Sequence, residues 1–164
     1  MGKKAKHQKT NAIRMLEKNA VPFQMHNFPW NEDHLGAEEA IEKLAVPKER
    51  IFKTLVTIGD KTGVVVAVIP GTSELNLKAL AKASGNKKIE MLHMKDLLAT
   101  TGYVRGGCSP IGMKKEFPTY LSTQAEKMDS MIVSAGKRGM QVELTPSGLI
   151  SITNGFFAEI EANS

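Results

Sequence analysis

The chain has 164 residues, of which 41% are hydrophobic and 24% are charged, and these values are typical of a soluble globular domain. No apolar run approaches the roughly 18 residues that a membrane span requires, and the basic N-terminus is not followed by the apolar stretch of a secretory signal. The single cysteine, Cys108, excludes an internal disulfide, so we expect a cytoplasmic protein. Four lysines among the first nine residues account for most of the net charge of +5, which makes overall charge weak evidence for nucleic-acid binding.

The first predicted elements are a helix that begins after Thr10, a residue able to cap its N-terminus, and a short strand over 23–28. A second helix is predicted over 35–45, because apolar residues recur there at helical spacing. Segments 51–58 and 64–70 are rich in β-branched residues and flank the turn sequence GDKTG. This pattern predicts a β-hairpin and is the strongest strand signal in the chain.

Beyond the hairpin, helices and strands mix irregularly. The sequence predicts, in order, a helix over 75–85, a strand over 87–92, a short helix ending at Gly102, and strands over 117–122, 131–135, 140–144 and 156–160. The segment 145–155 fits either a helix or a hairpin turn at Asn154–Gly155, and we favour the helix. Because repeated βαβ units are missing, the pattern favours a mixed sheet of the α+β class. We expect one domain over 10–164, preceded by a basic tail over 1–9.

The stretch GGCSPIG (106–112, the glycine loop) holds the cysteine between glycines and a Ser-Pro pair. Gly107 and Gly112 have the spacing of a phosphate-binding loop, but Met113 stands where that motif has lysine, and Pro110 removes a backbone donor. The loop is therefore either an ordinary turn or a backbone cradle for some other ligand. A nucleophilic Cys108 needs a base, and no histidine stands in a pattern that relates it to Cys108. The same scarcity of Cys and His disfavours a zinc site.

Basic residues gather at two turns, which suggests an anionic ligand. Arg105, Lys114 and Lys115 flank the glycine loop, and Lys137–Arg138 lie in SAGKRG (134–139, the basic turn). Lys53 is unusual in another way, because strand alternation places it on one face with apolar neighbours. That face either lies at a sheet edge or opens into a pocket where the lysine reaches a ligand.

Three motifs occur in this order: FKTLV (52–56), TGYVRGGCSPIG (101–112) and VSAGKRG (133–139). Together they resemble the YbaK/EbsC family, which comprises free-standing Cys-tRNA(Pro) deacylases related to the editing domain of bacterial prolyl-tRNA synthetases. The resemblance covers nearly the whole chain outside the tail. It implies a single α+β domain in which a large, mixed, barrel-like sheet is flanked by helices. It also implies a reaction without cofactor, metal or protein nucleophile, in which the substrate's cysteinyl thiol attacks its own ester to form a cyclic thiolactone.

The resemblance assigns the catalytic role to Lys53, which would hold the terminal adenosine or stabilise charge on the ester. The substrate-binding residues that it implies are Phe28, Thr54, Gly106, Gly107, Ser109, Pro110, Ser134, Gly136, Lys137, Arg138 and Gln141. The glycine loop would form one wall of the pocket, and the basic turn would form the other and meet the CCA end. Some relatives have tyrosine in place of Phe28 and an acid in place of Gln141, so this chain must anchor the substrate's amine or ribose differently.

The expected function is trans-editing, in which mischarged Cys-tRNA(Pro), and possibly Cys-tRNA(Cys), is cleared by a protein recruited to prolyl-tRNA synthetase. Two alternatives stay open. One is hydrolysis of Ala-tRNA(Pro), in which water must be the nucleophile because alanine has no thiol. The other is a non-catalytic module that binds an aminoacyl or nucleotide ligand. Comparison of cysteine and alanine release separates the three.

Overall fold

The computed structural model describes residues 9–28 and 46–162. Its helices are α1 (Asn11–Lys18), α3 (Leu77–Ser84), α4 (Leu97–Thr101) and α5 (Pro146–Thr153), with 3-10 turns η2 (Lys48–Arg50), η3 (Met94–Asp96) and η4 (Thr123–Lys127). The strands are β1 (Gln24–Asn27), β2 (Phe52–Gly59), β3 (Gly63–Pro70), β4 (Ile89–Met91), β5 (Thr119–Ser122), β6 (Met131–Ser134), β7 (Met140–Leu144) and β8 (Phe156–Ala158). This mixture confirms the α+β class. The helix predicted over 35–45 and most of the basic tail lie outside the described residues.

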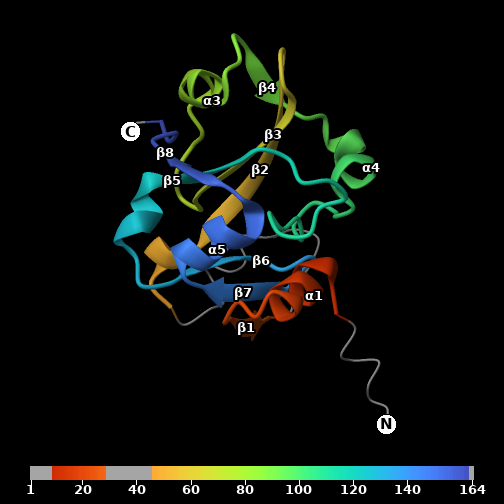
Figure 1. Cartoon of the computed structure of the whole chain (residues 1–164), viewed down its shortest axis with the longest axis vertical. Helices are drawn as coiled ribbons and strands as arrows, with labels where there is room; N and C mark the ends of the chain where they lie inside the picture. The colour runs from red at the N-terminus through yellow and green to blue at the C-terminus, as the bar shows by residue number, and fades with distance from the viewer. Residues whose placement is uncertain (1–8, 29–45, 163–164) are drawn as a thin grey trace.

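Two sheets form the framework of the described chain (Figure 1). The larger has the order β4-β2-β3-β5-β8 and is antiparallel from β4 to β3 and parallel from β3 to β8. The smaller, β1-β7-β6, is antiparallel throughout. The two sheets join where Ile51, just before β2, forms a parallel bridge with Ile132 of β6. The strands of the expected barrel-like sheet are thus divided between two sheets that meet at this bridge.

The predicted hairpin is confirmed, because β2 and β3 pair along their whole length from Phe52↔Pro70 to Gly59↔Gly63. β3 is buried on both faces. Val66 and Val68 lie in the main core with side chains of α1 and α5, whereas Val65, Ala67 and Ile69 pack with Leu80 and Ala81 of α3. A strand covered on both faces needs apolar residues at successive positions, which explains the uninterrupted run VVVAVIP.

Side-chain caps begin the longer helices. Thr10 Oγ1 accepts a hydrogen bond from Ile13 N at 3.2 Å to start α1, as predicted. Thr145 Oγ1 accepts one from Gly148 N at 3.0 Å to start α5, so the ambiguous segment 145–155 is a helix that ends at Asn154 in the left-handed conformation. None of the described helices is both long and apolar enough to cross a membrane.

Candidate functional site

The register of the strands places four polar side chains in one line across one face of the framework. Ser134 of β6 pairs with Gln141 of β7, which pairs in turn with His26 of β1. Residues directly opposite in a sheet share a face and have Cβ atoms about 4.5–5.5 Å apart. Lys53 lies two residues after Ile51, and Ser134 lies two residues after Ile132, the bridge partner of Ile51. Strand alternation therefore puts Lys53 on the same face as Ser134. We call Lys53, Ser134, Gln141 and His26 the polar row.

β2 is only partly paired where Lys53 lies. β4 pairs with β2 only at Thr57 to Gly59, so the Lys53 end of the strand has a ladder partner only on its β3 side. Among the described residues, the only backbone bridge between this part of the chain and β6 is that of Ile51, just before β2, with Ile132. Lys53 therefore stands half-buried at a local edge, beside the place where the two sheets separate.

The glycine loop lies directly against the basic turn. A Cβ atom on Gly107 would lie 2.8 Å from the Lys137 carbonyl carbon and 3.0 Å from Arg138 N, so only glycine allows this approach. Arg138 Nε donates a hydrogen bond to Arg105 O at 2.9 Å. The two segments that the resemblance assigns to opposite walls of one pocket are thus in contact. This contact connects the loop to β6 and β7, which carry two residues of the polar row.

The other side of the glycine loop packs on β2 through Cys108. Cys108 lies in a small apolar cluster with Val56 and Tyr103, and its Sγ donates to Thr101 Oγ1 at 4.0 Å. Burial raises the pKa of the Cys108 thiol to about 11. With that pKa, roughly one thiol in ten thousand is ionised at pH 7, which disfavours Cys108 as a nucleophile. Burial also raises the pKa of Tyr103, whose hydroxyl donates to Ile111 O at 2.7 Å.

The expected substrate-binding residues differ in their access to a ligand. Five of them are buried: Phe28, Gly107, Ser109, Pro110 and Gln141. The others, together with Lys53, are half-buried or exposed: Thr54, Gly106, Ser134, Gly136, Lys137 and Arg138. Ser109 shows what the buried set does, because its Oγ accepts from Ile111 N at 3.2 Å and thereby holds the loop in shape. Ser109 therefore shapes the site, and the half-buried and exposed set is open to direct contact with a ligand.

Two buried oxygens of the expected binding residues have no hydrogen-bond partner. These atoms, Thr54 Oγ1 and Gln141 Oε1, are the unsatisfied buried side-chain atoms found in the described part of the chain. Gln141 is 1% exposed and uses its Nε2 to donate to Ser134 Oγ at 3.2 Å, which leaves Oε1 as an unused acceptor. An unsatisfied buried polar group costs about 1–3 kcal/mol. A ligand that brought a donor to Gln141 Oε1 would recover part of this cost.

Glu143 is the centre of a polar cluster that sequence reasoning missed. Its Oε1 lies 2.7 Å from His26 Nε2, and its Oε2 accepts from Ser130 Oγ and lies 3.6 Å from Arg50 Nη1. The hydrogen bond from Ser130 and the nearby His26 and Arg50 lower the pKa of the Glu143 carboxyl. Glu143 thus stays ionised and holds His26 in the polar row. Because these residues are far apart in sequence, the only available signal was the alternation that puts Glu143 on the face of Gln141.

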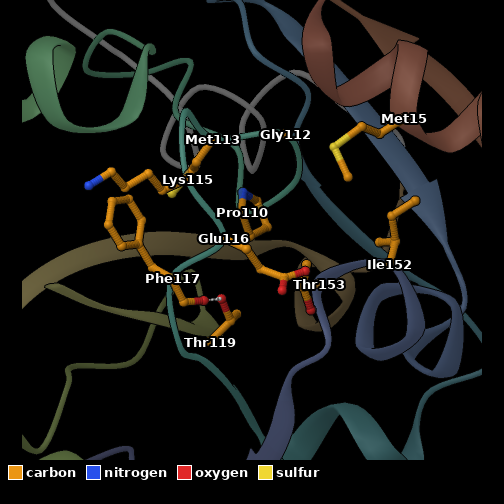
Figure 2. A pocket seen from close by; sticks show the side chains of 10 residues that line it. All are labelled: Met15, Pro110, Gly112, Met113, Lys115, Glu116, Phe117, Thr119, Ile152 and Thr153. Carbon is orange, nitrogen blue, oxygen red and sulfur yellow. Dashed lines mark hydrogen bonds between the residues drawn. The ribbon is translucent and has the colours of Figure 1, made fainter. Parts of the chain in front are cut away.

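A separate small cavity lies behind the glycine loop (Figure 2). Its volume is about 60 Å³, and it shares only Pro110 with the expected binding residues. In Figure 2, Met15 and Ile152 line one side and Phe117 the other, while the Lys115 side chain extends away. The lining of the cavity includes neither Lys53 nor any residue of the basic turn. The candidate site is the polar row and not this cavity.

The fold and the contact between the glycine loop and the basic turn go together with similarity to one family of proteins. The profile of the aminoacyl-tRNA editing domain matches residues 32–152, and the chain belongs to this family. Among its relatives, an Enterococcus faecalis protein named as a candidate Cys-tRNA(Pro)/Cys-tRNA(Cys) deacylase, EbsC, is 66% identical over 160 residues, which are 98% of each chain. A proline–tRNA ligase of Shouchella clausii is 29% identical over 126 residues, which are 76% of this chain but 20% of the ligase. The solved structure of a candidate trans-editing enzyme for prolyl-tRNA synthetase has a TM-score of 0.82 at 21% identity, with 93% of this chain and 96% of that chain covered.

Proposed function

We propose that this protein is an aminoacyl-tRNA deacylase that clears cysteine from mischarged Cys-tRNA(Pro). Membership of the editing-domain family supports deacylation, and the name of the E. faecalis relative supports the choice of amino acid. The observation that carries the proposal is the contact of the glycine loop with the basic turn beside the polar row. This arrangement brings the three motifs of the sequence together, because the glycine loop also packs on Val56 of β2 through Cys108.

The proposed reaction uses the sulfur of the substrate. The cysteinyl thiol attacks its own ester carbonyl, the bond from carbonyl carbon to ribose oxygen breaks, and the thiol proton ends on that oxygen. The products are a cyclic thiolactone and free tRNA. An enzyme that works in this way needs to position the two reacting groups, which is worth several kcal/mol, and needs no nucleophile of its own. Cys108 is buried and protonated, which agrees with a reaction in which the substrate supplies the nucleophile and the protein positions it.

In this reaction the Lys53 ammonium stabilises the negative charge that develops on the ester oxygen. Its partly unpaired strand leaves the side chain accessible on the face of the polar row. Gly106 has a φ angle of 88°, so this position presents backbone instead of side chain to the substrate, whereas Gly136 packs closely on Thr10 and Tyr103 and holds the basic turn in place. Lys137 and Arg138 then meet the phosphates of the CCA end, while Thr54 and Gln141 offer their unused oxygens to the amine or the ribose.

We also propose that proline–tRNA ligase is the partner. Stretches similar to this chain lie inside ligases such as those of Shouchella clausii and Burkholderia vietnamiensis, and they make up 20% and 22% of those proteins. A domain of this size has little surface with which to read a tRNA by itself. Association with the ligase would supply the missing selectivity for tRNA(Pro), and it places the reaction in the cytoplasm.

The test is the initial rate of deacylation of Cys-tRNA(Pro), with Ala-tRNA(Pro) run beside it at the same enzyme concentration. We expect loss of cysteine with alanine spared. Lys53→Met keeps the apolar stem and removes the charge, and should lower kcat/KM for cysteine about 100-fold or more. Lys61→Met, in the exposed turn between β2 and β3, is the matched control and should leave kcat/KM unchanged.

Three results would contradict the proposal. Release of alanine as fast as cysteine would require water as nucleophile and would remove the thiol mechanism. Full activity of Lys53→Met would remove Lys53 from the reaction. Release of neither amino acid, with the aminoacyl-tRNA still bound, would leave a binding module.

A further inference from the structure

Exposed apolar side chains gather on one short segment next to the glycine loop. Met91, Met94, Leu98 and Val104 are 45%, 56%, 54% and 40% exposed. Of the large hydrophobic residues that are exposed in the described ranges, these are four of six, the others being Ile58 and Phe156. We call Met91, Met94, Leu98 and Val104 the α4 face. A contiguous exposed apolar patch costs stability and solubility, and such patches commonly mark interaction surfaces.

The outward position of these side chains is not needed to fold the segment. η3 and α4 are consecutive, and Met94 and Leu98 are both more than half exposed. Leu97, between them in sequence, holds the segment in place, because it packs on the cluster of Val56, Tyr103 and Cys108. Figure 1 shows α4 at the outer rim of the molecule, far from β1 and β7. The segment thus has one apolar side chain packed on the protein and two that face solvent.

The α4 face is fixed relative to the candidate site. Lys114, which follows the glycine loop, donates from Nζ to Ala99 O at 3.1 Å. Cys108 within the loop donates to Thr101 Oγ1 at the end of α4. A partner bound to the α4 face would therefore hold the glycine loop at a defined distance and orientation.

Positive charge is in excess along the segment that carries the α4 face. Residues 87–115 contain six lysines and arginines and two acidic residues, Glu90 and Asp96. Lys95 and Arg105 each follow one of the apolar side chains directly in sequence, Lys114 contacts Ala99 O of α4, and all three are exposed, as is Glu90 beside Met91. An apolar centre with a basic rim fits a protein surface that has an apolar centre and an acidic rim. Nucleic acid fits less well, because Met, Leu and Val offer no stacking surface for bases.

We propose that the α4 face is the docking surface for proline–tRNA ligase, through a ligase surface whose apolar centre is bordered by carboxylates. This inference rests on the proposed function, which supplies the partner. Where the editing domain is part of a ligase, covalent linkage keeps it near the mischarged tRNA at a high effective concentration. A free-standing domain reaches the same place by affinity. Two adjacent apolar anchors in a basic rim provide that affinity and speed the encounter.

The test measures the affinity of the full-length protein for purified proline–tRNA ligase from the same host, by calorimetry at low and at physiological salt. The double variant Met94→Ser/Leu98→Ser removes the apolar centre. Phe156→Ser is the matched control, because Phe156 is 60% exposed and lies on β8, outside the α4 face. Thermal unfolding confirms that each variant folds. We expect the double variant to bind at least tenfold more weakly and the control to bind within twofold of wild type. Lys95→Glu should weaken binding, and more so at low salt.

Deacylation of Cys-tRNA(Pro) without ligase is measured for the same variants and should stay at the wild-type rate, because Met94 and Leu98 are exposed and do not belong to the cluster that packs on the loop. A wild-type protein that binds ligase through the α4 face but does not deacylate would refute the proposed function and leave the docking surface in place. The docking proposal is overturned if wild type does not bind the ligase, or if the double variant binds as wild type does. It is also overturned if the double substitution weakens binding to tRNA alone, because RNA would then be the occupant. The same holds if wild type sediments as a dimer and the double variant as a monomer, because a second copy of this chain would then be the occupant.

Discussion

Gly107→Ala tests directly whether the contact between the glycine loop and the basic turn shapes the site. The added Cβ would lie 2.8 Å from the Lys137 carbonyl carbon, whereas ordinary contacts of this kind begin at 3.4 Å. Loop and turn must therefore separate by at least about half an ångström, and both sides of the contact are backbone, which yields less easily than a side chain. Overpacking of this kind costs about 1–3 kcal/mol of folding free energy. A displacement of about 1 Å at an active site can cost about 100-fold in rate.

We therefore expect Gly107→Ala to lower kcat/KM for Cys-tRNA(Pro) by about 10- to 100-fold. Its melting temperature should fall by about 2–12 °C, since the cost of about 1–3 kcal/mol corresponds to about 2–4 °C for each kcal/mol in a domain of this size. Gly63→Ala is the control for stability alone, because Gly63 has a φ angle of +80° but lies in the open turn of the hairpin with no atom near its would-be Cβ. It should lower the melting temperature without changing kcat/KM. The reasoning is refuted if Gly107→Ala retains activity within twofold while its stability falls as expected.

Two further predictions follow from ionisable groups whose pKa values shift on folding. Cys108→Ala should retain kcat/KM within about threefold, and the thiol of the native protein should resist iodoacetamide until the pH approaches its pKa of about 11; near-complete loss of deacylation would restore Cys108 as a nucleophile. Glu143→Gln should lower the free energy of unfolding by about 1–2 kcal/mol at pH 7, because the amide weakens the contacts with Ser130, His26 and Arg50. Since the pKa of Glu143 is lowered on folding, its contribution is complete above the ordinary carboxyl pKa and disappears as the pH falls through the folded value, so urea unfolding should show a gap between wild type and variant at pH 7 that shrinks as the pH is lowered below the ordinary carboxyl pKa. A gap that keeps its size as the pH falls would contradict this assignment.

Local features of the structure were predictable from sequence because local signals determine them. The hairpin follows from two β-branched runs around a turn, and Thr10 begins the first helix because its hydroxyl can cap it. Ala20 shows where periodicity misleads: it continues the apolar spacing of α1, but the helix ends at Lys18 and Ala20 is exposed with φ of 54°. The resemblance to a known family predicted that the three motifs belong to one pocket, but it did not predict the register of the strands.

The polar row could not be predicted, because it depends on contacts between distant parts of the chain. It arises from the register of β1 on β7 and of β7 on β6, and from the single bridge between Ile51 and Ile132. The cluster at Glu143 has the same origin. Periodicity of two residues along a strand shows which side chains share a face, but it does not show which strand lies next to it.

The pairing of β1 with β7 has a consequence for folding during synthesis on the ribosome. Gln24 and Glu143 are in register although 119 positions separate them, so β1 leaves the ribosome long before its partner strand exists. At a synthesis rate of about 5–20 residues per second, this interval is about 6–24 s. During that time the strand that carries His26 has a free edge and is open to mispairing with another nascent chain. The polar row is complete only after β7 has been made, so a truncated product that ends before β7 contains Lys53 and the glycine loop but has no site in which they can work.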